Sequence, residues 1–181
     1  MATLSTTAWV LHELGLAAGF GSNLFGQIAL NPAVAEIQSK RERGKVTHVA
    51  WDRYKVINGA SLALMAGTWF AGRALLTGRE RRTTGPLMIT KDVLVGGALV
   101  TGTLSLVLGR MLDKEVAASN APIHAGSRPM AQTRERVARL QGLSNNVGRI
   151  NILMSAAVLA VTTVLTMRSG RSNKVVSRLL P

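Results

Sequence analysis

Four long apolar runs alternate with polar, basic segments along this chain. They cover about residues 8–30, 56–76, 93–112 and 150–167. Each run approaches the roughly 20 residues that an α-helix needs to cross the hydrocarbon core of a bilayer. The third run carries no charged residue between Val93 and Gly109. The pattern predicts an all-α fold, an integral membrane four-helix bundle, in which the 181 residues form a single domain.

Small and polar residues share one face of each predicted helix. In the first run, His12, Gly15, Gly19, Asn23 and Gln27 fall on one side at helical spacing. Hydrocarbon cannot satisfy amide or imidazole groups, and small residues let helices approach closely. The corresponding stripes in the other runs are Asn58, Ser61, Met65, Thr68 and Gly72; Ala98, Gly102, Ser105 and Gly109; and Gly148, Asn151, Ser155 and Thr162. These stripes predict a close-packed bundle without a wide pore.

The polar residues inside the runs are candidates for a functional site. Ionisable residues are costly within a membrane span, so His12 and Glu13 stand out first. The alternative for this pair is hydration near the first turn of the helix. Asparagines within spans also serve as structural hydrogen-bonding groups between helices. The candidate intramembrane polar cluster consists of His12, Glu13, Asn23, Gln27, Asn58 and Asn151.

The chain is strongly basic, with 22 Lys and Arg against nine carboxylates and a formal charge of +13. The basic residues lie almost entirely outside the apolar runs, which is typical of membrane topology and of contact with anionic lipids. No RNA-binding pattern with interleaved aromatic residues occurs, so we expect lipids and other membrane subunits as partners, and no nucleic acid. The candidate contacts to lipid headgroups or partners are Lys40, Arg41, Arg43, Arg79, Arg81 and Arg82.

The distribution of these charges also predicts an orientation. The segments after the first and third runs together hold more Lys and Arg than the segments on the opposite side. The positive-inside rule then places both termini on the non-cytoplasmic side. We expect a bacterial inner membrane or a mitochondrial inner membrane.

Signatures of chemistry are missing from the sequence. The chain has no cysteine, which excludes disulfides and thiolate sites. The sequence contains no HExxH, GxSxG or P-loop motif, so we expect no enzyme and assign no catalytic or metal-binding residues. A bis-histidine haem would need a second axial ligand besides His12, but His48 and His124 lie outside the apolar runs. We therefore expect no cofactor.

Two local patterns predict where helices begin. Asn31-Pro32 is typical of an N-cap followed by a proline at the first helical position, and predicts a short surface helix that ends near Gly44. Asp92 precedes the third apolar run, where a carboxylate complements the helix dipole. We therefore expect Asp92 to cap that helix.

Several short motifs occur in a characteristic order along residues 9–167. They are His12 in the first run, Asn31-Pro32-Ala33 at its end, Arg53-Tyr54 before the second, and Arg139-Leu140-Gln141-Gly142-Leu143-Ser144-Asn145 before the fourth. In this order the chain resembles a four-helix membrane family of unknown function related to the transmembrane protein 205 group. Gln141 stands where that family usually has a histidine. The resemblance implies the architecture, but no catalytic residue and no substrate.

Two functions follow as hypotheses. The first is a non-catalytic accessory or structural subunit that acts through protein and lipid contacts in a larger membrane complex. The alternative is a transporter or channel for ions or small solutes, with His12, Glu13 and Asn23 in a polar pathway. Because four helices are few for a pathway, this alternative requires an oligomer.

Overall fold

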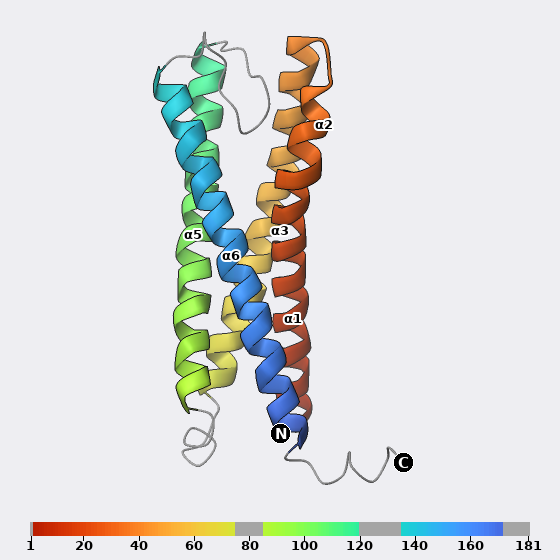
Figure 1. Ribbon diagram of the computed structural model, residues 1–181, viewed down its shortest axis with the longest axis vertical. Helices are drawn as coiled ribbons and strands as arrows, with labels where there is room; N and C mark the ends of the chain where they lie inside the picture. Colours follow the sequence, from red (N-terminus) through yellow and green to blue (C-terminus); the bar gives the residue numbers. More distant parts are fainter. Residues whose placement is uncertain (1, 75–84, 120–134, 172–181) are drawn as a thin grey trace.

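The fold is a bundle of long α-helices. The computed structural model describes residues 2–74, 85–119 and 135–171. In chain order its elements are α1 (Ala2–Phe25), the π-helical turn η1 (Gly26–Leu30), α2 (Asn31–Ala35), α3 (Lys40–Ala74), α5 (Gly85–Ser119) and α6 (Glu135–Arg171). Figure 1 shows the four long helices α1, α3, α5 and α6 side by side along one axis. The predicted all-α four-helix bundle is confirmed.

The bundle consists of two antiparallel helix pairs. Packing is most extensive between α1 and α3 and between α5 and α6. Helix α6 starts beside α5 at one end of the bundle and reaches α1 at the other, so that it crosses between the pairs (Figure 1). The amino-terminal end of α1 and the carboxy-terminal end of α6 therefore lie at the same end of the bundle.

Small residues in the predicted stripes allow the helices to approach closely. A Cβ atom on Gly15 of α1 would lie 2.9 Å from the backbone nitrogen of Met65 and the carbonyl oxygen of Ser61 in α3. A Cβ atom on Gly102 of α5 would lie 2.6 Å from a methyl carbon of Leu62. Real Cβ atoms do not fit at these distances, so glycine is required at Gly15, where backbone atoms would have to move, whereas at Gly102 the Leu62 side chain would have to shift. The predicted close packing is confirmed here.

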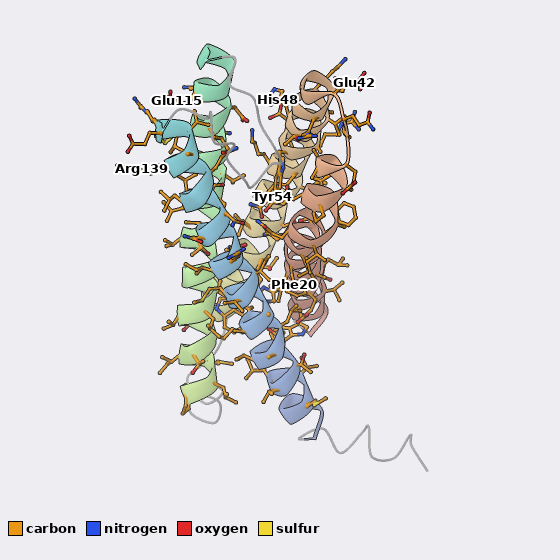
Figure 2. The ribbon with its side chains drawn as sticks, turned by 45° about the horizontal axis from the view of Figure 1, so that its top comes forward. Phe20, Glu42, His48, Tyr54, Glu115 and Arg139 are labelled. Carbon is orange, nitrogen blue, oxygen red and sulfur yellow. The ribbon has the colours of Figure 1, made fainter. Side chains whose placement is uncertain are left out.

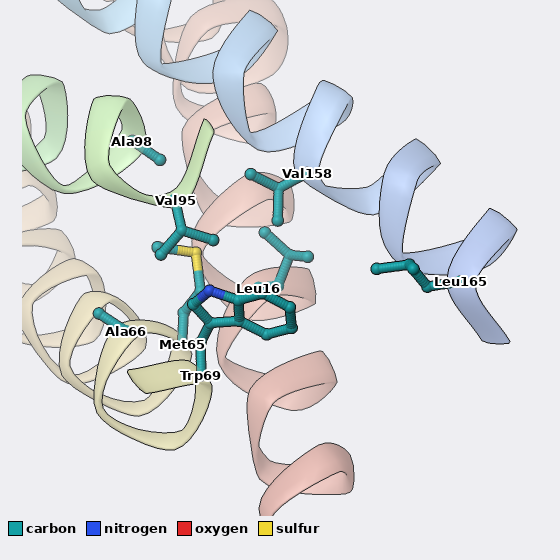
Figure 3. Close-up of a cluster of buried hydrophobic side chains, with 8 residues drawn as sticks. All are labelled: Leu16, Met65, Ala66, Trp69, Val95, Ala98, Val158 and Leu165. Atoms are coloured by element: carbon teal, nitrogen blue, oxygen red, sulfur yellow. The ribbon is translucent and has the colours of Figure 1, made fainter. Parts of the chain in front are cut away.

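A buried apolar cluster holds the two pairs together near the middle. Leu16 of α1, Met65 of α3, Val95 of α5 and Val158 of α6 all belong to it. Figure 3 shows these side chains converging between the helices, with Trp69 beside them. Leu16, Val95 and Val158 are almost completely shielded from solvent. The cluster closes the interior of the bundle at this level.

Two helices are long and apolar enough to cross a membrane. The segments are Gly85–Glu115 in α5 and Glu135–Met167 in α6, and they contain the predicted spans 93–112 and 150–167. Only 22% and 28% of their most apolar windows are buried inside the bundle. Within the described residues, α1 and α3 do not meet the same criterion, because polar residues interrupt them. For these two helices, membrane spanning stays a prediction.

The predicted N-cap at Asn31 is wrong. The backbone N–H of Asn31 donates to the carbonyl of Gly26, five residues earlier, so the π-helical turn continues the helix through the Asn-Pro pair. The chain breaks later, where Glu36 and Ile37 donate to carbonyls three residues back. The Ser39 hydroxyl then accepts from the backbone N–H of Glu42 and caps α3.

Gly44 and Asp92 also differ from expectation. Gly44 lies inside α3 instead of ending a separate surface helix. Helix α5 begins at Gly85, so Asp92 sits in its third turn and does not cap its first one. The carboxylate of Asp92 instead accepts a hydrogen bond from the indole of Trp69 on α3, at 2.8 Å from Nε1.

Candidate functional site

The most unusual group in the described structure is Lys91, in the second turn of α5. Its side chain is 0% exposed. The ammonium nitrogen lies 4.2 Å from the ring centroid of Trp69 on α3 and 4.6 Å from that of Trp9 on α1. Cation–π attraction to two indoles stabilises the charge. Among the described residues, Lys91 Nζ has no hydrogen-bond partner.

His12 lies against the same two indoles. Its ring centroid is 6.0 Å from that of Trp9 and 5.7 Å from that of Trp69. Its Nδ1 lies 2.7 Å from the carbonyl oxygen of Met65. Because a carbonyl only accepts, this contact places a proton on Nδ1. His12 Nε2 is buried and has no partner among the described residues.

Glu13 follows His12 on α1 and is partly exposed. Its carboxylate is near enough to attract the Lys91 ammonium electrostatically. We call the group formed by Lys91, Trp9, Trp69, His12 and Glu13 the lysine cage. Three helices contribute to it, so it also joins the α1–α3 pair to α5. Chemically, it offers an ammonium with free donors and an imidazole nitrogen with a free lone pair.

A second polar layer lies further along the bundle. Asn23 Nδ2 of α1 donates to Oδ1 of Asn151 on α6 at 2.9 Å. Asn151 Nδ2 in turn donates to the carbonyl oxygen of Ala98 and to Oγ1 of Thr101 on α5, both at 2.9 Å. The hydroxyl of Tyr54 on α3 donates to Asn23 Oδ1. We call Tyr54, Asn23, Asn151 and Thr101 the asparagine layer, which links all four long helices.

The structure places four of the six residues of the predicted polar cluster in these two layers. His12 and Glu13 belong to the lysine cage. Burial of His12 to 1% exposure contradicts hydration of that side chain, whereas Glu13 is partly exposed. Asn23 and Asn151 belong to the asparagine layer. Gln27 lies one turn beyond Asn23, with its Nε2 3.1 Å from the position of a Cβ on Gly148. Asn58 is buried, and its Nδ2 has no partner among the described residues.

Sequence reasoning missed Lys91, Trp9 and Trp69. Lys91 precedes the predicted start of the third span and falls among the basic residues outside the apolar runs. A signal was present, because Lys91, Val95, Ala98 and Gly102 follow one another at spacings of four, three and four residues. Those spacings place Lys91 on the inward face of α5.

The predicted headgroup contacts differ in their surroundings. The side chain of Arg43 is buried, and its Nε donates to the carbonyl oxygen of Ile37 at 3.0 Å. Arg43 thereby ties α3 to the turn before it. Lys40 and Arg41 are the first residues of α3, and their side chains lie outside the described set. Arg79, Arg81 and Arg82 lie outside the described residues.

Charged groups also meet at the opposite end of the bundle from the lysine cage. His48, Asp52 and Lys55 of α3 face Asp113 of α5 there, and Figure 2 shows His48 near this end together with Glu42 and Glu115. Lys55 Nζ contacts both carboxylates. The ligand atoms of His48, Asp52 and Asp113 lie within 4.8 Å of one another, as a metal site would require. Lys55 lies against both carboxylates and offsets part of their charge, so an ion-pair network accounts for the group without a metal.

These contacts change the pKa values of the charged groups. The hydrogen bond from Lys55 lowers the pKa of Asp52. Desolvation acts to lower the pKa of Lys55, but its hydrogen bonds to Asp113 and Asp52 outweigh this effect and raise it. Both shifts favour the charged forms near neutral pH, and the charged Lys55 holds α3 to α5 through Asp113.

Comparison with known proteins adds no relative to this description. No family model matches the chain, and no curated protein or solved structure shows significant similarity to it.

Proposed function

We propose that the chain is an integral membrane protein whose four long helices span the bilayer. We further propose that it acts without catalysis, as an accessory or structural subunit of a larger membrane complex. The observation that carries this proposal is the distribution of polarity. Polar groups such as Asn151, Thr162 and Lys91 are buried between the helices, while large apolar side chains cover the outside.

The outward apolar residues occur on all four long helices. Prominent examples are Leu14, Phe25 and Ile28 before α2; Val56, Ile57 and Phe70 on α3; Val93, Val100 and Val107 on α5; and Ile150, Leu153 and Met167 on α6. A soluble bundle would direct such residues inward, since large contiguous apolar surface in water favours association. Lipid or a partner helix gives these side chains an apolar environment.

Three features support a role in contacts over a role in catalysis. The asparagine layer is fully used in joining helices, and the interior between the two polar layers is filled by Leu16, Val95 and Val158. The outer surface offers apolar area to neighbouring proteins and lipids. The resemblance to the transmembrane protein 205 group, the inner-membrane location and the orientation of the termini remain part of this proposal.

The test is the native mass of the protein after gentle solubilisation from its own membrane, with identification of whatever co-migrates. Extraction at alkaline pH comes first, because a spanning protein stays in the membrane pellet. A defined assembly with stoichiometric partners supports the accessory role. A lone monomer rejects it, and release at alkaline pH rejects the membrane placement itself.

The second candidate function is a transporter or channel that works as an oligomer. Charged and ionisable groups inside the bundle, namely Lys91 and His12, favour it. A pathway from the lysine cage to the asparagine layer would require the contact between Leu16, Val95 and Val158 to open. The discriminating measurement is solute or ion flux into proteoliposomes. Flux that disappears in His12→Ala with Glu13→Ala, but persists in Asn146→Ala on the exposed face of α6, supports transport; no flux in the wild type rejects it.

A further inference from the structure

The lysine cage contains two buried polar atoms whose hydrogen-bonding capacity is unused. Lys91 Nζ carries three N–H donors, and none of them meets an acceptor in the described structure. His12 Nε2 is also unpartnered, although Nδ1 of the same ring is engaged with Met65. Buried polar groups are nearly always satisfied, so two such atoms beside the same indoles require an explanation.

We infer that the lysine cage binds the phosphate monoester head of an amphiphile with an apolar tail. One oxygen of the phosphate would accept a hydrogen bond from Lys91 Nζ, and a second oxygen of the same phosphate would form a hydrogen bond with His12 Nε2. A phosphate monoester suits both nitrogens because it titrates near pH 6 and therefore presents both P–O⁻ and P–OH groups around neutrality. The P–OH group donates to a neutral Nε2, and P–O⁻ accepts from a protonated one.

The surroundings of the cage account for the apolar tail. Exposed apolar side chains flank the cage on two of its helices: Val10 follows Trp9 on α1, and Phe70 follows Trp69 on α3. A ligand that entered past Trp9 would have the exposed side chain of Val10 beside it, which suits an apolar tail. The partly exposed Trp9 and Glu13 form the outer wall, so entry requires movement at α1 and leaves the fully packed Val95 in place.

The proposal does not depend on whether the chain has partner subunits. The cage is also a different site from the basic surface residues that are predicted to contact lipid headgroups. Trp9 and Trp69 are two of the three tryptophans in the chain, so ligand entry should change the fluorescence of the protein. The carboxylate of Glu13, at the outer wall of the cage, should repel the negative charge of a bound phosphate. Its removal should therefore strengthen binding, while removal of Lys91 should weaken it.

The experiment uses the full-length protein in dodecyl maltoside, an uncharged detergent, with dodecyl phosphate as the probe. Bound probe is counted by native mass spectrometry and followed by tryptophan fluorescence. We expect saturable binding of one molecule per chain in the wild type. Lys91→Met should weaken it about tenfold or more, the loss expected when a charge-assisted hydrogen bond is removed. The matched control Lys114→Met removes an exposed lysine of the same helix and should leave binding unchanged.

Competition with inorganic phosphate distinguishes a site for free phosphate from a site for the phosphate head of an amphiphile. Displacement of dodecyl phosphate by inorganic phosphate indicates that the site takes a free phosphate group, whereas failure to displace it supports the amphiphile. Circular dichroism checks that Lys91→Met keeps its helices; if it does not, Glu13→Gln decides, and tighter binding supports the site. The inference is overturned if the wild type shows no saturable binding, or if the affinity is the same in the folded Lys91→Met variant.

Discussion

Asn23 and Asn151 meet across the interior of the bundle, where the amide of one donates to the carbonyl of the other at 2.9 Å. They lie 128 positions apart in the chain, in its first and last long helices. Each side chain uses its second polar atom as well, Asn23 toward Tyr54 and Asn151 toward α5. This single contact therefore joins the α1–α3 pair to the α5–α6 pair.

Replacement of Asn151 by leucine should destabilise the bundle. The change leaves Asn23 Nδ2, a buried donor, without its acceptor and removes both hydrogen bonds to α5. We expect a loss of about 1–3 kcal/mol in the free energy of unfolding, with the lower part of the range more typical of membrane helices. The measurement is unfolding in detergent, followed by circular dichroism.

The matched control is Asn146→Leu, five residues earlier on α6, where the asparagine is exposed. This variant should unfold at nearly the wild-type midpoint. Equal stability of the two variants would mean that the asparagine layer contributes no more than surface amides do.

Two glycines of α1 should respond in opposite directions to alanine. At Gly15 the new methyl group would meet backbone atoms of α3 at 2.9 Å, which forces the helices apart. We expect a loss of about 1–3 kcal/mol, as for overpacked cores. At Gly21 a Cβ meets nothing within 4 Å, so alanine should stabilise the helix by about 0.5–1 kcal/mol. Thermal unfolding of both variants tests this, and a Gly15→Ala midpoint at or above the wild-type value would refute the close approach.

Much of the architecture could be predicted from the sequence because helix periodicity survives in each apolar run. His12, Gly15 and Asn23 were expected on one face of α1, and all three are buried. Stripes of this kind report which side of a helix faces protein. They contain no information about the level at which two helices meet, so the pairing of Asn23 with Asn151 could not be deduced.

The lysine cage was hidden from sequence reasoning by the assumption that charge marks the end of a span. Lys91 and Asp92 precede the most apolar part of α5, yet both side chains reach tryptophans of neighbouring helices. Aromatic partners at Trp9 and Trp69 make burial of the ammonium tolerable, and these partners come from distant parts of the chain. Whether a charged residue lies on the inward stripe of a helix is therefore a better guide to its burial than its distance from the helix end.

The contact of Lys55 with Asp113 and Asp52 should make stability depend on pH in a defined window. The pKa of Lys55 is raised in the folded protein, so its contribution is complete below the usual lysine pKa of 10.5 and is lost as pH rises through the folded value. The pKa of Asp52 is lowered, so its contribution is complete above the usual value of 3.8 and is lost as pH falls through the folded value. Between these limits the contact should be constant.

Lys55→Met measures this contribution. Because the lysine is partly screened by solvent, we expect a loss of about 1 kcal/mol near neutral pH. The difference from the wild type should shrink as pH rises beyond 10.5 and through the raised pKa of Lys55. Lys45→Met, which removes an exposed lysine of the same helix, should show little effect at any pH. A difference that stays constant through the alkaline range would contradict an ionic contact.

The absence of cysteine allows the outward face of α6 to be tested directly with single spin labels. Leu153 is 68% exposed and lies one turn inside the apolar run 150–167 of α6, whereas Val158, little more than one turn later, is 0% exposed. In liposomes, a label at Leu153→Cys should be accessible to oxygen, which concentrates in hydrocarbon, and protected from a water-soluble nickel chelate. A label at Val158→Cys should be protected from both, and one at the exposed Arg139→Cys should meet the chelate. If the chelate reaches Leu153 as readily as Arg139, α6 faces water and the membrane placement of the bundle fails.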